Sequence, residues 1–156
     1  MKALLLFLSN IIAFNANAVS LATDGVLSDT QRYTFQIETP KAFLSGVLMT
    51  KAQDDSIIGS MVNEFGVSAI DFSFSIKKDK LKLINVVSFL NKWYIKKTLD
   101  SDLKFIIHQI YHLPWKNKHH YIVESVDDSI TILNSRRKLK YVFTPLIAPA
   151  NYDTEE

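Results

Sequence analysis

Residues 69–76 read Ala-Ile-Asp-Phe-Ser-Phe-Ser-Ile, the most regular alternation of apolar and polar side chains in this chain. The apolar residues at even positions share one face of an extended segment, and the polar residues between them share the other. A strand with one buried and one solvated face is typical of an antiparallel sheet. This stretch therefore predicts a strand whose even-numbered side chains enter a hydrophobic core.

Segments on both sides of this stretch read as further strands separated by short polar turns. Three of its neighbours have the spacing of an antiparallel meander, and four other segments show the same strand signals. The predicted strands are 31–38, 43–51, 57–63, 69–76, 81–87, 119–126, 129–134 and 139–144.

The period changes from two to that of a helix between residues 88 and 114. Ser88 is placed to cap a first helix that contains Phe89 and Trp93. A second helix is expected to begin near Asp100 or Ser101 and to end before Pro114. Strands, then two helices, then strands predict an α+β fold with an antiparallel sheet.

The chain begins with the pattern of a cleavable signal peptide at 1–18. Lys2 precedes an apolar run that is too short to span a bilayer, and cleavage is expected between Ala18 and Val19. No cysteine is present, so Val19 cannot carry the lipid of a bacterial lipoprotein. The expected product is periplasmic or secreted, with an irregular lead-in at 19–30, one domain at 31–147 and an acidic tail at 148–156. Alternatives are a transmembrane anchor or a buried N-terminal helix.

Charge gives little reason to expect a nucleic acid partner. The chain has 18 Lys and Arg against 16 Asp and Glu, a net charge of +2, which falls to +1 when Lys2 leaves with the leader. Lys92, Lys96, Lys97 and Lys104 nevertheless gather in the predicted helices. They indicate either an ordinary solvated face or peripheral contact with lipid phosphates or an acidic protein.

The residues that could support catalysis or metal binding have simpler explanations. His108 and His112 have the spacing of a metal pair on an exposed helix face, but neither an intervening carboxylate nor an obvious third ligand accompanies them. Paired acids such as Asp54-Asp55 and Asp127-Asp128 suit turns. No nucleophile elbow or phosphate-binding glycine loop is present. The sequence therefore predicts a non-enzymatic protein with no cofactor and no metal.

Two predicted strands, 43–51 and 57–63, are apolar on both faces. In the first, Val47 and Met49 oppose Leu44 and Leu48. Either protein covers both faces, or one face lines a cavity for an apolar ligand. Phe105, opposite the apolar stripe of the second helix, is a similar case.

Residues 44–103 resemble uncharacterised envelope proteins of gram-negative bacteria. The resemblance lies in Val62-Asn63-Glu64-Phe65-Gly66 with Ile70-Asp71-Phe72, and in the run from Phe89 to Leu99. These proteins are similar to the lipoprotein-localisation carriers and receptors. The resemblance implies a curved, incomplete half-barrel sheet covered by two central helices, with acyl chains held in the hollow between them. This chain departs from that pattern in lacking the lipid-bearing cysteine and in having a short C-terminal part.

We therefore expect a soluble envelope protein that binds an acyl chain or another apolar ligand, and that acts like a lipid or lipoprotein carrier. The residues expected to line the hollow or its polar rim are Phe43, Val47, Met49, Phe72, Phe74, Trp93, Lys92 and Lys96. The alternative is a structural or protein-interaction module of the cell envelope, docked on a protein partner through its sheet edge or basic helix.

Overall fold

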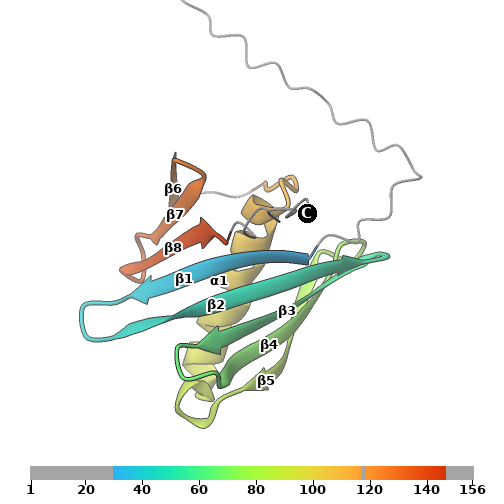
Figure 1. Ribbon diagram of the computed structural model, residues 1–156. Helices are drawn as coiled ribbons and strands as arrows, with labels where there is room; N and C mark the ends of the chain where they lie inside the picture. Colours follow the sequence, from blue (N-terminus) through green and yellow to red (C-terminus); the bar gives the residue numbers. More distant parts are fainter. Residues whose placement is uncertain (1–29, 117–118, 147–156) are drawn as a thin grey trace, which may run out of the picture.

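The computed structural model describes residues 30–116 and 119–146. The predicted leader, the lead-in up to residue 29 and the predicted tail lie outside the described residues. The described chain forms one eight-stranded antiparallel sheet with one α-helix (Figure 1). Its elements are β1 (Thr30–Glu38), β2 (Phe43–Gln53), β3 (Ser56–Asn63), β4 (Ser68–Ser75), β5 (Lys80–Val86), the 3₁₀ helix η1 (Ser88–Leu90), α1 (Trp93–Ile110), β6 (Tyr121–Val126), β7 (Ser129–Asn134) and β8 (Leu139–Pro145).

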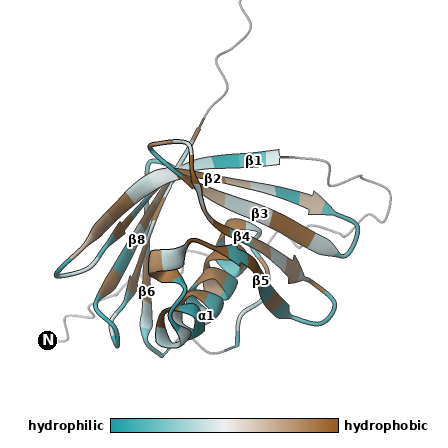
Figure 2. Ribbon diagram, turned by 90° about the horizontal axis from the view of Figure 1, so that it is seen from below, coloured by the Kyte–Doolittle hydropathy of each residue, from teal (hydrophilic) through white to brown (hydrophobic). Residues whose placement is uncertain are grey.

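All eight predicted strands are confirmed, with ends that differ by one or two residues. The strand order is β5-β4-β3-β2-β1-β8-β7-β6, so β1 pairs with β2 on one side and with β8 on the other. β5 and β6 are the two edges, and the sheet is open. Figure 2 shows the sheet curving around α1, which lies inside the curve. The predicted antiparallel sheet is therefore observed as an open, curved layer around a single helix.

The alternation in β4 has the predicted consequence. Ile70, Phe72 and Phe74 are fully buried on the inner face, toward α1. On the outer face, Asp71 accepts hydrogen bonds from the Ser60 and Ser68 hydroxyls at 2.6 and 2.7 Å. The hydrogen bond from Ser60 is the main cause that lowers the pKa of Asp71, against the opposing effect of burial.

Gly59 in β3 provides the space that Phe72 needs. The two residues are directly opposite in the β3–β4 ladder, and a Cβ at Gly59 would lie 2.2 Å from Cζ of Phe72. Any larger residue at this position would displace a ring whose burial stabilises the fold by about 2 kcal/mol. A glycine inside a strand is thus explained here by the close approach of a side chain.

The strands that are apolar on both faces place their second set of apolar side chains outside the curve. Leu48 in β2 is buried on the inner face, whereas Val47 and Met49 lie on the outer face. Val47 is paired across the strands with Val62 of β3. Within residues 30–116 and 119–146, the only α-helix lies on the inner side of the sheet. The outer apolar residues therefore do not face the hollow between sheet and helix.

The expectation of two helices is wrong, because α1 runs without interruption from Trp93 to Ile110. Ser101, one of the two expected starts of the second helix, directs its hydroxyl back along α1, and so does Thr98. Thr98 donates to the Tyr94 carbonyl at 2.9 Å, and Ser101 donates to the Thr98 carbonyl at 2.9 Å. A hydroxyl satisfied within the preceding turn does not need to cap a new helix. The predicted helix start at Ser88 is instead the short η1.

The curvature of the sheet buries α1 on more than one side. Phe105, which lies off the main apolar stripe, is fully buried and stacks on Tyr121 of β6 with a centroid distance of 4.0 Å. Its ring also meets Trp115 edge to face at 5.2 Å. The segment after the helix and the edge strand β6 therefore cover the side of α1 that the sequence left without a partner.

Asp102 is a buried carboxylate at the centre of this contact, only 1% exposed. Tyr121 and Tyr141 donate their hydroxyls to it at 2.7 and 2.6 Å, and the side-chain amide of Asn134 donates at 2.9 Å. One residue of α1 is thereby bound to β6, β7 and β8. Burial, together with the hydrogen bond and charge of Asp102, raises the pKa of both tyrosines, so both remain donors at neutral pH.

Replacing Asp102 by Ala should lower the free energy of unfolding by about 3 kcal/mol, because two buried hydroxyls and an amide would lose their acceptor. The matched control is Asp100→Ala, an exposed carboxylate two positions earlier in α1, with an expected change within about 0.5 kcal/mol. Urea unfolding of both variants measures the difference. Equal losses in the two variants would contradict this role for Asp102.

Candidate functional site

An apolar cavity of about 410 Å³ lies between the sheet and the beginning of α1. Its walls come from the β1–β2 turn, η1, the first two turns of α1 and the start of β8. The described residues that line it are Ile37, Thr39, Ala42, Phe43, Leu44, Ile70, Phe89, Leu90, Tyr94, Ile95, Thr98, Leu99, Leu139 and Tyr141. We call this space the apolar cavity.

The β1–β2 turn is held in place by its own hydrogen bonds. The Thr39 hydroxyl oxygen accepts from the backbone N–H groups of Lys41 and Ala42 at 3.1 and 2.7 Å. The backbone N–H of Thr39 donates to the Ala42 carbonyl at 2.9 Å. Pro40 occupies the turn, where its fixed φ suits the backbone. This local structure sets Ala42 and Phe43 at the wall of the apolar cavity.

Exposed aromatic side chains surround the apolar cavity. Phe43, Phe89 and Tyr94 line it and are 61, 59 and 53% exposed. Trp93 is 76% exposed and meets Tyr94 edge to face at 5.9 Å. We call these four residues the aromatic rim. An apolar interior that reaches the surface through aromatic side chains is accessible from outside the protein.

The structure brings together only some of the residues predicted from sequence. Phe43 lines the apolar cavity, whereas Phe72 and Phe74 are fully buried in the core, Phe74 also beside a second pocket. Val47 and Met49 lie on the outer face of the sheet, away from the cavity.

The other three predicted residues lie at the start of α1. Trp93 belongs to the aromatic rim, and Lys92 and Lys96 are exposed beside it. The structure thus places four of the eight residues, counting Phe43, near one opening.

Sequence reasoning missed cavity residues that come from distant strands. Ile37 of β1, and Leu139 and Tyr141 of β8, reach the cavity through the pairing of β1 with β8, for which the sequence carries no local signal. Leu44 could have been found, because it lies on the same face as Leu48, opposite the predicted Val47 and Met49.

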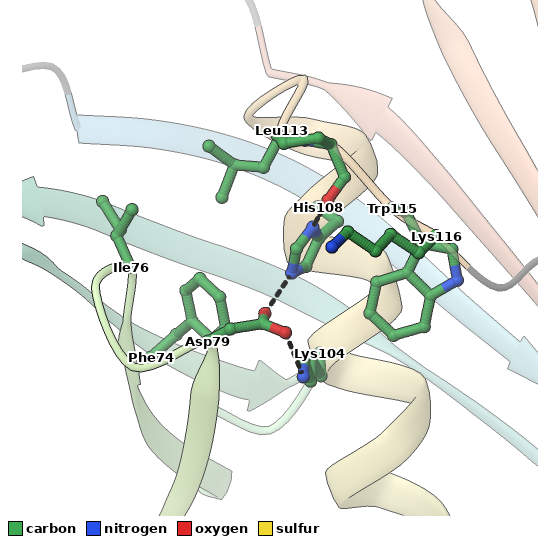
Figure 3. A pocket seen from close by; sticks show the side chains of 9 residues that line it. Phe74, Ile76, Asp79, Lys104, His108, Leu113, Trp115 and Lys116 are labelled. Atoms are coloured by element: carbon green, nitrogen blue, oxygen red, sulfur yellow. Dashed lines mark hydrogen bonds and ion pairs between the residues drawn. The ribbon is translucent and has the colours of Figure 1, made fainter.

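A second pocket of about 460 Å³ lies near the other end of α1 and is more polar. In Figure 3, Asp79 from the β4–β5 turn lies between His108 and Lys104 of α1. Lys104 Nζ donates to Asp79 Oδ2 at 2.7 Å, and His108 Nε2 lies 2.8 Å from Asp79 Oδ1. We call this the Asp79 pocket.

The contacts of His108 occupy both of its ring nitrogens. Nδ1 lies 2.9 Å from the Pro114 carbonyl oxygen, which can only accept a hydrogen bond. The ionised Asp79 carboxylate at Nε2 also only accepts. Both ring nitrogens are therefore in contact with protein oxygens, and neither is free to bind a metal.

The expectation that His108 and His112 share an exposed helix face is wrong. His108 is 6% exposed, with its ring between Phe74 and Trp115. His112 lies beyond the end of α1 with a φ of 52°. There the Leu113 N–H donates to the His108 carbonyl at 2.8 Å and closes the helix before Pro114. Among the residues described, no group of three or more His, Asp or Glu side chains could hold a metal ion.

Asp79 should make the protein sensitive to acid. Burial raises its pKa, but the hydrogen bonds and positive charges of Lys104 and His108 outweigh that effect and lower the pKa below the ordinary 3.8. A lowered pKa contributes stability that is complete above about pH 4 and is lost as the pH falls through the folded-state value.

We therefore predict that Asp79→Asn lowers the melting temperature by about 2–3 °C at pH 6, and that this difference shrinks at pH 2.5. Thermal unfolding at the two pH values measures it. Asp54→Asn is the matched control, a turn carboxylate with a similar φ of 51°, and should change little at either pH. A difference of the same size at both pH values would contradict the prediction.

In the described part of the chain, no helix is long and apolar enough to cross a membrane. No protein-family model matches the sequence, and no curated protein is significantly similar to it. The predicted resemblance to lipoprotein-localisation carriers therefore stays a prediction, and the function has to be argued from the geometry.

Proposed function

We propose that this protein binds an acyl chain, or another slender apolar ligand, in the apolar cavity and serves as a non-enzymatic carrier in the cell envelope. The observation that supports the proposal is a cavity of about 410 Å³ that opens through an aromatic rim. Its volume is within the range of about 300–1,000 Å³ that is usual for ligand sites. The predicted leader would deliver the protein to the periplasm or outside the cell.

The lining favours an apolar ligand because three of its four side-chain hydroxyls are already hydrogen-bonded within the protein, and the fourth, that of Tyr94, belongs to a half-exposed side chain of the aromatic rim. The Thr39 hydroxyl is bound within the β1–β2 turn. The Thr98 hydroxyl donates to the Tyr94 carbonyl and accepts a hydrogen bond from the Arg137 guanidinium. The Tyr141 hydroxyl donates to Asp102. These groups have partners inside the protein, so the surface left for a ligand is mainly hydrocarbon.

The cavity has the composition of a binding site, without groups for general acid–base catalysis. Its described lining contains no carboxylate, imidazole or amine. The most buried carboxylate nearby, Asp102, accepts hydrogen bonds from three different residues that hold the fold together. To bind a hydrocarbon chain, a cavity needs only a matching shape and the exclusion of water.

The opening suits a ligand with a polar head. A chain buried among Leu44, Ile95 and Leu139 would leave its head at the aromatic rim, near Lys92 and Lys96. This is the polar-rim role that the sequence predicts for the two lysines, and it agrees with their exposure at the start of α1.

A second candidate function is a protein-interaction module. β6 is an edge strand, and Ile122, Val123 and Val126 on it are 51, 37 and 66% exposed. An exposed apolar edge can pair with a strand of another chain. Recovery of a stoichiometric protein partner by crosslinking in cells, with no bound lipid, would favour this function over the carrier.

Affinity for saturated fatty acids should rise with chain length until the cavity is filled. Each buried methylene contributes about 0.8 kcal/mol, which corresponds to about fourfold in Kd. Isothermal titration of delipidated protein with acids of increasing length measures this step. Absence of binding at every length, together with no bound ligand in native mass spectrometry, would contradict the proposal.

Filling the cavity should abolish this binding. Ala42→Trp adds an indole at the cavity wall without removing an apolar contact, and should weaken fatty-acid binding by more than about tenfold. Met49→Trp, on the outer face of the sheet, is the matched control and should bind as the unaltered protein does. Equal affinities of the two variants would place the binding site elsewhere.

A further inference from the structure

All four side chains of the aromatic rim are more than half exposed. Its four side chains come from the start of β2, from η1 and from the first turn of α1, all of which line or adjoin one cavity opening. Trp93 is the most exposed of them at 76%. Trp and Tyr side chains are enriched where proteins meet the interface of a bilayer, because their rings combine apolar and polar parts.

The first turn of α1 lacks the features that usually stabilise the beginning of a helix. Its N-cap residue is Lys92, which makes no side-chain capping bond, and its first turn contains no acidic residue. Lys96 and Lys97 follow within the same part of the helix. Cations near a helix N-terminus are disfavoured by the helix dipole. Residues that oppose local stability in this way are expected at functional surfaces.

These lysines are exposed and stay positive toward solvent. Lys92, Lys96 and Lys97 are all exposed, and none of them forms an ion pair within the described residues. The carboxylate of Glu38, near the same end of the sheet, is paired with Lys140 at 3.4 Å. A cluster of unpaired cations beside exposed aromatic rings is complementary to a surface of lipid phosphates.

We propose that the aromatic rim and Lys92, Lys96 and Lys97 dock this protein on an anionic membrane, with the opening of the apolar cavity facing the bilayer. The aromatic rings enter the interfacial region, and the lysines contact the phosphates. Docking on a membrane requires only the aromatic rim and the three lysines, and it does not depend on the proposed carrier function. If the carrier function also holds, an acyl chain passes between bilayer and cavity without crossing water.

Tryptophan fluorescence can report contact between the aromatic rim and a bilayer. Trp115 packs against Phe105 and His108, so Trp115→Phe leaves Trp93 as the only tryptophan. We expect its emission to shift to shorter wavelength, and to be quenched by brominated lipid, on vesicles of phosphatidylcholine with phosphatidylglycerol. The signal should be much weaker on phosphatidylcholine alone and should fall as salt is added. Co-sedimentation of the unsubstituted protein with the same vesicles gives a second readout that does not depend on the variant.

The role of charge is tested with two triple variants that remove the same number of cations. Lys92→Gln, Lys96→Gln and Lys97→Gln together should weaken binding to the anionic vesicles by at least about tenfold. Lys51→Gln, Lys77→Gln and Lys78→Gln remove exposed cations near the β2–β3 and β4–β5 turns, and should have little effect. Equal losses in the two triples would overturn docking through this face.

Fatty-acid titration in vesicle-free solution separates this proposal from the carrier function. Retained fatty-acid binding with no vesicle binding would overturn the docking and leave the carrier intact. Vesicle binding without fatty-acid binding would support the docking and refute the carrier. Capture of an acidic protein by the rim, with no affinity for either vesicle, would also overturn the docking.

Discussion

The acceptance by Asp102 of hydrogen bonds from three strands of the sheet is the constraint on which the arrangement of this protein depends. A carboxylate that is 1% exposed is tolerated only when its lone pairs are satisfied. Here the donors come from three successive strands, β6, β7 and β8, which meet α1 at one residue. The apolar contacts between helix and sheet would by themselves allow sliding. The directional bonds at Asp102 fix how deep the helix lies and how it is rotated within the curve of the sheet.

That fixed point divides α1 into two ends with different surroundings. Toward its end, His108 and Lys104 are bound to Asp79, so the β4–β5 turn closes over the helix. Toward its beginning, comparable polar contacts are fewer, and aliphatic and aromatic side chains surround a cavity instead. The helix is therefore anchored at its middle and end and is bordered by a cavity at its start.

The sequence predicted the strands well because their signals are local. The alternation in residues 69–76, the turn residues and the hydrophobic runs each act over a few positions. It failed on the helix because Ser101 resembles a cap residue, yet its hydroxyl donates to the Thr98 carbonyl in the preceding turn. It placed Val47 and Met49 in the hollow because two-sided apolar strands do not reveal which face is the inner one. The choice depends on which way the sheet curves, and Phe72 over Gly59 belongs to that inner face.

The pairing of β1 with β8 has a consequence for how the chain folds. β1 lies near the middle of the sheet, but its second neighbour is the last strand, about 110 residues later in the chain. Long-range pairings of this kind slow folding, because a large loop must close before any contact repays the lost entropy. Until residues 139–145 have been synthesised, β1 can only be an edge. A growing chain of this protein therefore cannot complete its core before residues 139–145 have been added.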